Sequence, residues 1–410
     1  MVIASEPATK SAAAHATSGV LLDPDLARAP LQVCSRCIYD ERVSDIEFNA
    51  DGVCSYCKLS DTLQERFQTG TPAGEVALEA IVAKIKAAGR GKPYDCVVGV
   101  SGGTDSSYMV QLTKDWGLRP LAVHYDNTWN SAIATQNIFK VLDALDVDLY
   151  THVVDNKESD DIFRAFFMAG VAEIDAATDL GLAETMYRAA WKYRIGYVLE
   201  GHSFLTEGVT PLGRNYFDGR YIESIHERFG TRPMNTYPLM TFSRFMFWTT
   251  VARIRKVRPF WYINYTKEDA RRHLEERYGW RYYGGHHLEN RMTAFYHGIY
   301  LPEKYGADMR NNSLAARARI GTMSREEAWA EYNTPPVVED ELLEYFQKRL
   351  GLSDQEYRRV MAEAPRSWTE YPTYKRRFER LRPLFAVLAR ANLVPTSFYL
   401  KYCFSAGEPT

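Results

Sequence analysis

A glycine turn between a strand pattern and a helix pattern is the strongest constraint on this chain. Residues 94–100 form a short apolar run rich in β-branched residues, and residues 108–112 return to apolar positions at helical spacing. Paired glycines let the backbone approach a ligand closely, and the first amides of a helix point outward without partners. Since the helix dipole adds partial positive charge there, the turn predicts an anion site, with a phosphate chain as the expected ligand. The residues of the turn are Ser101, Gly102, Gly103, Thr104, Asp105, Ser106 and Ser107.

The turn differs from a Walker A loop. That loop ends in Gly-Lys followed by Ser or Thr, whereas no lysine follows these glycines before Lys114. A plain helix N-terminus that binds nothing is the alternative interpretation. The strand pattern before the turn and the helix pattern after it favour the anion site.

Strand and helix patterns alternate on both sides of the turn. The spacing predicts strands over residues 119–125, 148–154 and 196–200 and helices over residues 75–88, 133–144 and 184–194. Such alternation is typical of an α/β fold with a doubly wound parallel sheet, which binds its ligand at the carboxyl ends of the strands. Asp126, Gly201 and His202 come at such ends and are assigned to the site. For His202 an ordinary hydrogen-bonded histidine is the alternative, and Asp155 is interpreted as a turn residue.

Four of the six cysteines form two closely spaced pairs. Sixteen residues separate Cys34 and Cys37 from Cys54 and Cys57, which is the spacing of a four-thiolate metal site. We assign zinc; an iron–sulfur cluster also accepts four thiolates, and disulfides are the other alternative. Because four thiolates leave no open coordination position, the expected metal is structural and holds together a small module with little core of its own.

Composition and charge narrow the function classes. Hydrophobic residues make up 46% of the chain and charged residues 25%, and the net charge is -2, so no global charge attracts nucleic acid or membrane. No apolar run approaches the length of a membrane span. Residues 1–30 are rich in Ala, Ser, Thr and Pro and lack an apolar signal-peptide core, which predicts a disordered tail of a cytoplasmic protein.

The rest of the chain is expected to fall into four parts. They are a four-cysteine module over residues 31–62, the sheet domain over residues 75–225, a mostly helical substrate-binding region over residues 226–336 and a helical extension over residues 337–410. Residues 243–265 interleave aromatic with basic side chains. RNA or membrane binding is one interpretation, and arginines beside buried aromatic rings on a packed helix are the favoured one.

Two histidines, a carboxylate and a guanidinium crowd into a few positions near residue 288. His286, His287, Glu289 and Arg291 would be costly to bury together without a function. A metal site would need a third ligand and an open position, so substrate binding is the favoured interpretation. A helix that begins at residue 288 would turn Glu289 and Arg291 to different faces, so that only part of the cluster could meet one ligand.

Five motifs, taken together, resemble those of one enzyme family. They are the two Cys-x-x-Cys pairs, the glycine turn, and residues 124–130, 221–230 and 282–287. The chain resembles the N-acetyl sugar amidotransferases, which are PP-loop ATP pyrophosphatases of bacterial surface-polysaccharide assembly, with an adenine nucleotide alpha hydrolase-like sheet. The resemblance covers residues 34–336, and residues 310–314 depart from the basic, histidine-containing run that the family would place there.

The resemblance implies ATP-dependent conversion of an acetamido group into an acetamidino group. AMP is transferred to the amide oxygen with release of pyrophosphate, and ammonia then displaces AMP. The resemblance also implies roles for the residues above. Residues 101–107 hold the pyrophosphate, Asp105 orients a magnesium ion or the loop, Asp126, Gly201 and His202 line the nucleotide, and His286, His287, Glu289 and Arg291 meet an N-acetyl sugar, expected to be nucleotide-linked.

Nothing in the chain resembles a glutaminase, so the resemblance implies that ammonia comes from a separate glutaminase with a cyclase-like subunit. A tRNA thiolase is the alternative enzyme, because it also adenylates a carbonyl oxygen. That activity needs catalytic cysteines or an open cluster and a basic RNA-binding face, whereas the spare thiols are Cys96 and Cys403 and the net charge is -2. A zinc-knuckle nucleic-acid binder would have a disrupted phosphate loop, and this loop is intact.

Overall fold

The computed structural model describes residues 31–208, 216–285, 288–391, 394, 398–399 and 402–404. The predicted tail over residues 1–30 lies outside the described residues, as do His286 and His287. Within the described part, no helix is both long enough and apolar enough to cross a membrane.

Five parallel strands form one sheet in the order β3-β2-β1-β4-β5. They are β1 (Cys96–Gly99), β2 (Pro120–Asp126), β3 (Leu149–Val153), β4 (Tyr197–Leu199) and β5 (Arg255–Val257). The first four fall within a residue of the predicted ranges or inside them, and the predicted α/β fold with a parallel sheet is confirmed. β5 corrects the prediction for residues 243–265, because part of that segment is a strand paired with β4 rather than a helix.

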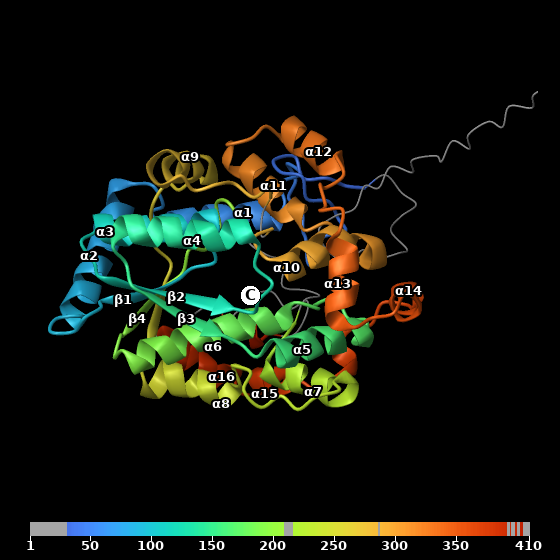
Figure 1. The fold of residues 1–410 in the computed structure, drawn as a ribbon. Coiled ribbons are helices and arrows are strands. Elements are labelled where there is room, and N and C mark those ends of the chain that lie inside the picture. Colours follow the sequence, from blue (N-terminus) through green and yellow to red (C-terminus); the bar gives the residue numbers. More distant parts are fainter. Residues whose placement is uncertain are drawn as a thin grey trace, which may run out of the picture.

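Helices cover both faces of the sheet (Figure 1). On one face lie α3 (Thr104–Asp115) and α4 (Ala132–Leu145), with α9 (Lys267–Tyr278) packed on them, and on the other lies α6 (Ala176–Lys192). Successive side chains of a strand point to opposite faces, and β1 follows this rule. Val98 belongs to the buried cluster of α3 and α4, and Val97 belongs to that of α6.

Short helices make up most of the remaining structure. The α-helices are α1 (Ser55–Phe67), α2 (Pro72–Ala88), α5 (Asn156–Ala169), α7 (Gly219–Phe229), α8 (Phe242–Met246), α10 (Arg291–Phe295), α11 (Arg310–Ile320), α12 (Arg325–Asn333), α13 (Leu342–Leu350), α14 (Asp354–Ala362), α15 (Lys375–Arg380) and α16 (Arg382–Arg390). The π-helical segments are η2 (Phe247–Val251) and η4 (Tyr296–Tyr305), and the short 3-10 segments are η3 (Pro259–Trp261) and η5 (Trp368–Glu370).

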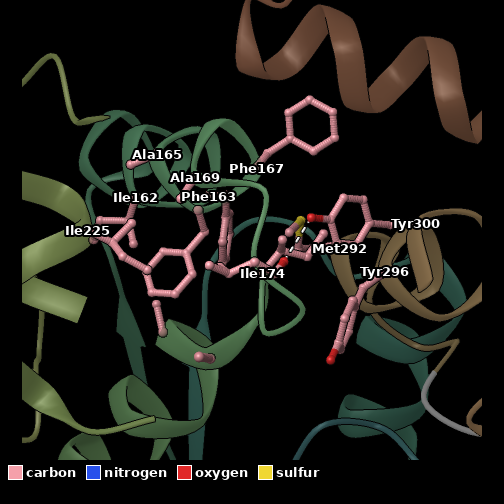
Figure 2. Packing of buried hydrophobic residues seen from close by; sticks show 14 of the residues in the cluster. Ile162, Phe163, Ala165, Phe167, Ala169, Ile174, Ile225, Met292, Tyr296 and Tyr300 are labelled. Atoms are coloured by element: carbon pink, nitrogen blue, oxygen red, sulfur yellow. Dashed lines mark hydrogen bonds between the residues drawn. The ribbon is translucent and has the colours of Figure 1, made fainter. Parts of the chain in front are cut away.

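The largest buried cluster joins α5 to helices from later in the chain. Figure 2 shows Phe167 of α5 among Met292 and Tyr300, with Ile225 of α7 on the other side of α5. The ring centre of Phe167 lies 5.7 Å from that of Tyr300 and 5.4 Å from that of Phe346 in α13. One core therefore draws on the predicted sheet domain, substrate-binding region and C-terminal extension.

The strand order reverses beside β1. The chain runs from β1 to β2 to β3 in one direction and then crosses to β4 on the other side of β1. In such a sheet a crevice opens at the carboxyl ends of the strands where the order reverses. Residues 100–103 follow β1 and residues 200–203 follow β4, so the fold itself brings the glycine turn to this crevice.

Candidate active site and four-cysteine site

The glycine turn leads from β1 into the first turn of α3. Gly103 is the N-cap of α3, and no side chain caps the helix there. Gly102 has a φ of 81°, and a Cβ on it would lie 2.1 Å from the carbonyl oxygen of Ala134 in α4, so only glycine fits. The amide of Ser101 donates to Oγ of Ser106 at 3.2 Å. The loop therefore presents helix amides without a side-chain cap and serine hydroxyls to the crevice, as an anion site requires.

Asp105, in the first turn of α3, is held by residues of a distant segment. Its Oδ2 lies 2.8 Å from Nζ of Lys267, the first residue of α9, and Tyr265 donates a hydrogen bond to its Oδ1. Nζ of Lys267 also lies 3.4 Å from Glu207. Burial raises the pKa of Asp105, against the opposing effect of Lys267. Burial lowers the pKa of Lys267, but Asp105 and Glu207 outweigh it and raise that pKa overall, so a cation stands beside a loop that contains none.

The loop after β4 brings Gly201 and His202 to the same crevice. A Cβ on Gly201 would lie 3.1 Å from the carbonyl oxygen of Asp105, so this loop is in close contact with α3. The indole N–H of Trp261 donates to Nδ1 of His202 at 3.2 Å, and Nε2 lies 3.6 Å from Glu207. Burial and, to a lesser extent, a neighbouring guanidinium lower the pKa of His202 from 6.5 to about 4. Near neutral pH the imidazole is uncharged, and because Nδ1 accepts a hydrogen bond, its proton is on Nε2.

The segment before α10 is tied to the loop between β2 and α4. The amide of Ser131 donates to the carbonyl oxygen of Glu289 at 2.8 Å. This attachment places the carboxylate of Glu289 at the phosphate loop, 3.3 Å from Oγ of Ser101. The helix predicted from residue 288 begins only at Arg291, whose guanidinium pairs with Glu339 at 2.7 Å. Of the described part of the predicted cluster, Glu289 thus reaches the phosphate loop, and Arg291 is engaged elsewhere on the cavity wall.

Three polar residues of the motif at residues 124–130 lie at the site, although the sequence assigned them no role there. Nδ1 of His124 donates to the carbonyl oxygen of Val100 at 2.8 Å, and Nδ2 of Asn130 donates to its Nε2 at 3.0 Å. Asn127 is buried, and its Nδ2 has no hydrogen-bond partner among the described residues. The sequence marks residues 124–130 as a motif of the resemblance, but the role of each residue depends on which strand lies beside β1.

Three predicted site residues shape the loops without lining the cavity described below: Gly102, Ser107 and Asp126. Asp126 accepts a hydrogen bond from the amide of Thr128 at 2.7 Å, as a turn residue does. Asp155, interpreted from the sequence as a turn residue, caps the start of α5. The other described non-cysteine site residues do line the cavity, and they are Ser101, Gly103, Thr104, Asp105, Ser106, Gly201, His202, Glu289 and Arg291.

These groups open onto one large cavity. Its volume is about 1550 Å³, whereas the pocket of a single drug-sized ligand measures roughly 300–1,000 Å³. The walls come from the phosphate loop, the ends of β2 and β4, the start of α9, the residues on either side of α10, and α11. No cysteine is among the described residues that line it. The space suits two ligands bound side by side.

The four predicted metal ligands converge at one point. Sγ of Cys34 lies 3.8 Å from Sγ of Cys57, Sγ of Cys37 lies 3.8 Å from Sγ of Cys54, and all four sulfur atoms lie within 4.8 Å of one another. These separations exceed the roughly 2.05 Å of a disulfide bond, and the four thiols are free and buried. The cluster can therefore hold a zinc ion or an iron–sulfur centre.

A helix far along the chain completes the surroundings of the cysteines. Nε of Arg319 in α11 lies 3.3 Å from Sγ of Cys57, and the hydroxyl of Tyr39 donates to Asn312 at 2.8 Å. Leu314 and other residues of α11 and α12 belong to the same buried cluster as the cysteines. The prediction of a module with little core of its own is thus refined, because the module shares a core with α11 and α12. Sequence reasoning missed Arg319, which no local pattern marks.

One region of the chain matches a known family. Residues 289–383 match the family model described as LPS biosynthesis protein WbpG-like, C-terminal domain. This region is WbpG-like. It supplies Glu289, Arg291 and the cavity-lining face of α11, and also the helices that pack on the four cysteines. The match confirms the resemblance to lipopolysaccharide-biosynthesis proteins for residues 289–383 and names no reaction.

Other comparisons are more distant. The uncharacterized protein MJ1599 of Methanocaldococcus jannaschii is 23% identical over 313 residues, which are 74% of this chain and 94% of that protein. The structural match to the NMN synthetase from Francisella tularensis covers 68% of this chain and 94% of the synthetase chain, at 13% identity and a TM-score of 0.31. The match to the U34-tRNA thiolase NcsA from Methanococcus maripaludis, with its 4Fe-4S cluster, covers 80% of this chain and 90% of the thiolase chain, at 10% identity and a TM-score of 0.30. At these TM-scores the overlap assigns no residue and no activity to this chain.

Proposed function

We propose that this protein is an ATP-dependent, AMP-forming amidotransferase that converts the acetamido group of an N-acetyl sugar into an acetamidino group in lipopolysaccharide biosynthesis. One observation carries the proposal. The start of α3, which no side chain caps, opens into the same cavity as side chains of the WbpG-like region, among them Glu289 and Arg317. The proposed phosphate loop and residues of the WbpG-like region therefore line the same cavity.

In this proposal the glycine turn binds the phosphates of ATP. Ser101, Gly103 and Ser106 line the cavity at the start of α3, where amides and hydroxyls can donate to phosphate oxygens. Lys267 is a cation beside the loop, where it pairs with Asp105 and Glu207 and so holds Asp105 in place. His202, neutral and protonated on Nε2, is a hydrogen-bond donor at the nucleotide rather than a base.

Asp105 is proposed to be a positioning residue. Both its carboxylate oxygens are engaged, one by Lys267 and the other by Tyr265, so of the two roles expected for it we favour orienting the loop. Glu289 is the buried carboxylate at the loop that would hold a magnesium ion together with phosphate oxygens, because Mg²⁺ prefers oxygen ligands. When bound, that ion would neutralise phosphate charge.

Adenylation makes an unreactive amide reactive. An amide carbonyl is a poor electrophile, and its oxygen is a poor leaving group. In the proposed reaction the amide oxygen attacks the α-phosphorus of ATP, an O–P bond forms and pyrophosphate leaves. Ammonia then adds to the imidate carbon, and AMP leaves with the former amide oxygen. The volume of the cavity supports this order of events, because ATP and the sugar must be bound together.

Zinc is the proposed occupant of the four-cysteine site. Four sulfur atoms at about 2.3 Å from a tetrahedral zinc ion lie about 3.8 Å apart, and the Cys34–Cys57 and Cys37–Cys54 separations are 3.8 Å. In a four-iron cluster each thiolate binds a different iron, which would spread the sulfur atoms beyond the 4.8 Å seen here. Since protein ligands fill every position, the ion is proposed to support the fold and to take no part in the reaction.

Ammonia suits this cavity better than sulfur. A thiolase needs a thiol or an open cluster at its site, but the described cavity wall contains no cysteine, and Cys96 and Cys403 are only 0% and 1% exposed. Release of ammonia from glutamine would likewise need a nucleophile such as cysteine. We therefore infer that a separate glutaminase supplies the ammonia, and the family resemblance implies that a cyclase-like subunit accompanies it.

Incubation of the purified protein with ATP, magnesium, isotopically labelled ammonium and UDP-N-acetyl sugars tests the proposal. The expected result is equimolar AMP and pyrophosphate, together with a sugar that has gained one labelled nitrogen and lost one oxygen, as seen by mass spectrometry. Release of AMP that requires tRNA and no sugar would contradict it and support the thiolase.

A further inference from the structure

Arg271 is a cation of the cavity wall that no described carboxylate neutralises. The other four cavity-lining cations each have acidic partners: Lys267 pairs with Asp105 and Glu207, Arg291 with Glu339, Arg310 with Asp308, and Arg317 with Glu268 and Glu331. Arg271 lines the same cavity and forms no ion pair within the described part of the chain. A guanidinium held without a counterion at a cavity is a receptor for an oxyanion.

The surroundings of Arg271 leave its hydrogen-bond donors available. The guanidinium carbon lies 3.6 Å from the centre of the Tyr282 ring, so the guanidinium stacks on the phenol. Its Nε is buried and has no hydrogen-bond partner among the described residues. Because a buried donor without a partner destabilises the folded protein, an acceptor from a ligand would restore the lost hydrogen bond. Stacking fixes the plane of the fork, which suits bidentate binding of a phosphate.

Arg271 continues the row of groups that begins at the phosphate loop. It follows Lys267 by one turn of α9, so the two side chains share a helix face and are about 6 Å apart along the axis. Lys267 contacts Asp105 in the first turn of α3. On the other side, the hydroxyl of Tyr283, the neighbour of Tyr282, would lie 3.1 Å from a Cβ on Gly103. Arg271 is therefore displaced from the loop by one helical turn and faces the same space.

We propose that Arg271 and Tyr282 form a second phosphate site, one helical turn beyond the phosphate loop. Two sources of that phosphate fit the cavity: the far end of the triphosphate of ATP, and a phosphate on the anomeric carbon of the sugar. The identity of these sources rests on the proposed function. The existence of the site rests on three observations: Arg271 has no ion pair within the described residues, it stacks on Tyr282, and its Nε is buried.

Calorimetric titration of the full-length protein tests this site without turnover. The variants are Arg271→Gln and Arg271→Lys, with Arg272→Gln as the matched control, because Arg272 is the next residue of α9, is 66% exposed and pairs with Asp269. The probes are ATP, AMP, N-acetylglucosamine 1-phosphate and N-acetylglucosamine. Arg271→Gln is expected to raise the Kd of a phosphorylated probe about tenfold. Arg271→Lys keeps the positive charge but lacks the planar guanidinium, so its Kd is expected to lie between those of the wild type and Arg271→Gln. Arg272→Gln is expected to leave the Kd unchanged.

The two arms identify the source. A raised Kd for ATP with that for AMP unchanged assigns the site to the far end of the triphosphate, and a raised Kd for the sugar phosphate with that for the free sugar unchanged assigns it to the sugar. Three results would overturn the site. They are unchanged binding of every probe by Arg271→Gln, an equal rise in Kd for both members of a probe pair (ATP and AMP, or the sugar phosphate and the free sugar), and a wild-type protein that binds neither phosphorylated probe. Circular dichroism of each variant checks that it is folded. Loss of phosphate binding in a protein that makes no acetamidino sugar would uphold the site and refute the proposed function.

Discussion

The four-cysteine site and the cavity differ in how their reactive groups are satisfied. The four sulfur atoms face one another and are fully buried, so one metal centre can satisfy all of them. The cavity has a volume of about 1550 Å³ and includes buried donors without a partner in the described structure, such as Asn127 and Arg271. Groups satisfied within a protein stabilise its fold, whereas unsatisfied groups at a cavity are available to a ligand. Substitutions should therefore lower stability at the first site and activity at the second.

Cys37→Ser should have the largest effect. Loss of one ligand releases the metal, and structural zinc contributes on the order of 10–16 kcal/mol of apparent binding free energy in small metal-dependent domains. The module shares its core with α11 and α12, so soluble yield and unfolding temperature are expected to fall together. Elemental analysis and scanning calorimetry measure both. Cys403→Ser replaces a buried thiol outside the cluster and should keep the metal. A metal-free Cys37→Ser protein of unchanged stability would contradict the claim that the four-cysteine site stabilises the fold.

Asp105→Asn should lower kcat/KM for ATP about hundredfold in a folded protein, because misplacement of a positioned group costs roughly that much. Asparagine keeps the size of the side chain but weakens its hold on Lys267, which then has Glu207 as its other partner. Pyrophosphate release measures the effect. Asp115→Asn, at the exposed end of the same helix, is the control and should retain full activity. Full turnover by Asp105→Asn would refute the positioning role.

Glu289→Gln should reduce activity about tenfold at low magnesium and less at high magnesium. The reason is that this carboxylate lies 3.3 Å from Oγ of Ser101 and is our proposed ligand of the ion. Rates across a magnesium titration provide the measurement. Glu339→Gln, which loses only the pairing with Arg291, should leave the magnesium dependence as it is. If Glu289→Gln showed the same magnesium dependence as the wild type, Glu289 would not be a ligand of the magnesium ion.

His202 should make the cavity region sensitive to acid. Its pKa is lowered by burial from 6.5 to about 4 in the folded protein, so between these values the unfolded chain binds more protons than the folded one. Stability is therefore expected to fall as the pH falls through that window. Urea unfolding of wild type and His202→Gln at several pH values tests this, since the variant should lose less stability on acidification. Parallel pH profiles would show that His202 does not titrate in this way.

Tyr39→Phe should have the smallest effect and tests whether the two regions are coupled. The Tyr39 hydroxyl donates to Asn312 of the cavity wall, whereas the Tyr56 hydroxyl donates to the carbonyl oxygen of Ser44 inside the module. Tyr39→Phe and its control Tyr56→Phe should each lower the free energy of unfolding by about 1 kcal/mol. Only Tyr39→Phe should also raise the KM of the sugar while the KM of ATP stays constant. Equal KM values in the two variants would mean that the regions act independently.

The sequence predicts best what is local in the chain. The phosphate loop and the cysteine pairs are short motifs whose spacing already carries their geometry, and the strands around the loop show apolar runs. The fifth strand does not, because Lys256 and Arg258 at β5 look like exposed charges until Glu200 at the end of β4 is seen to pair with both. Those two cations lower the pKa of Glu200 to about 2 despite its burial, so the charged form is kept.

The rest of the candidate site depends on long-range packing. Lys267 and Tyr265 reach Asp105 only because α9 packs on α3, and Arg319 reaches the cysteines only because α11 packs on the module. The sequence predicts Arg291 as a ligand-binding residue, but its guanidinium pairs with Glu339. Arg271, which no motif marks, lines the cavity without an ion pair among the described residues. A single sequence shows which residues can do chemistry, and the tertiary structure decides which of them remain available.

The most direct test of the central claim follows the amide oxygen. An N-acetyl sugar substrate with a heavy-oxygen label in its acetamido group is incubated with the protein, ATP, magnesium and ammonium, and the AMP is examined by mass spectrometry. Adenylation of the amide oxygen predicts that the label is transferred into the phosphate of AMP as the sugar gains nitrogen. Unlabelled AMP, with the heavy oxygen still on the sugar, would contradict the account.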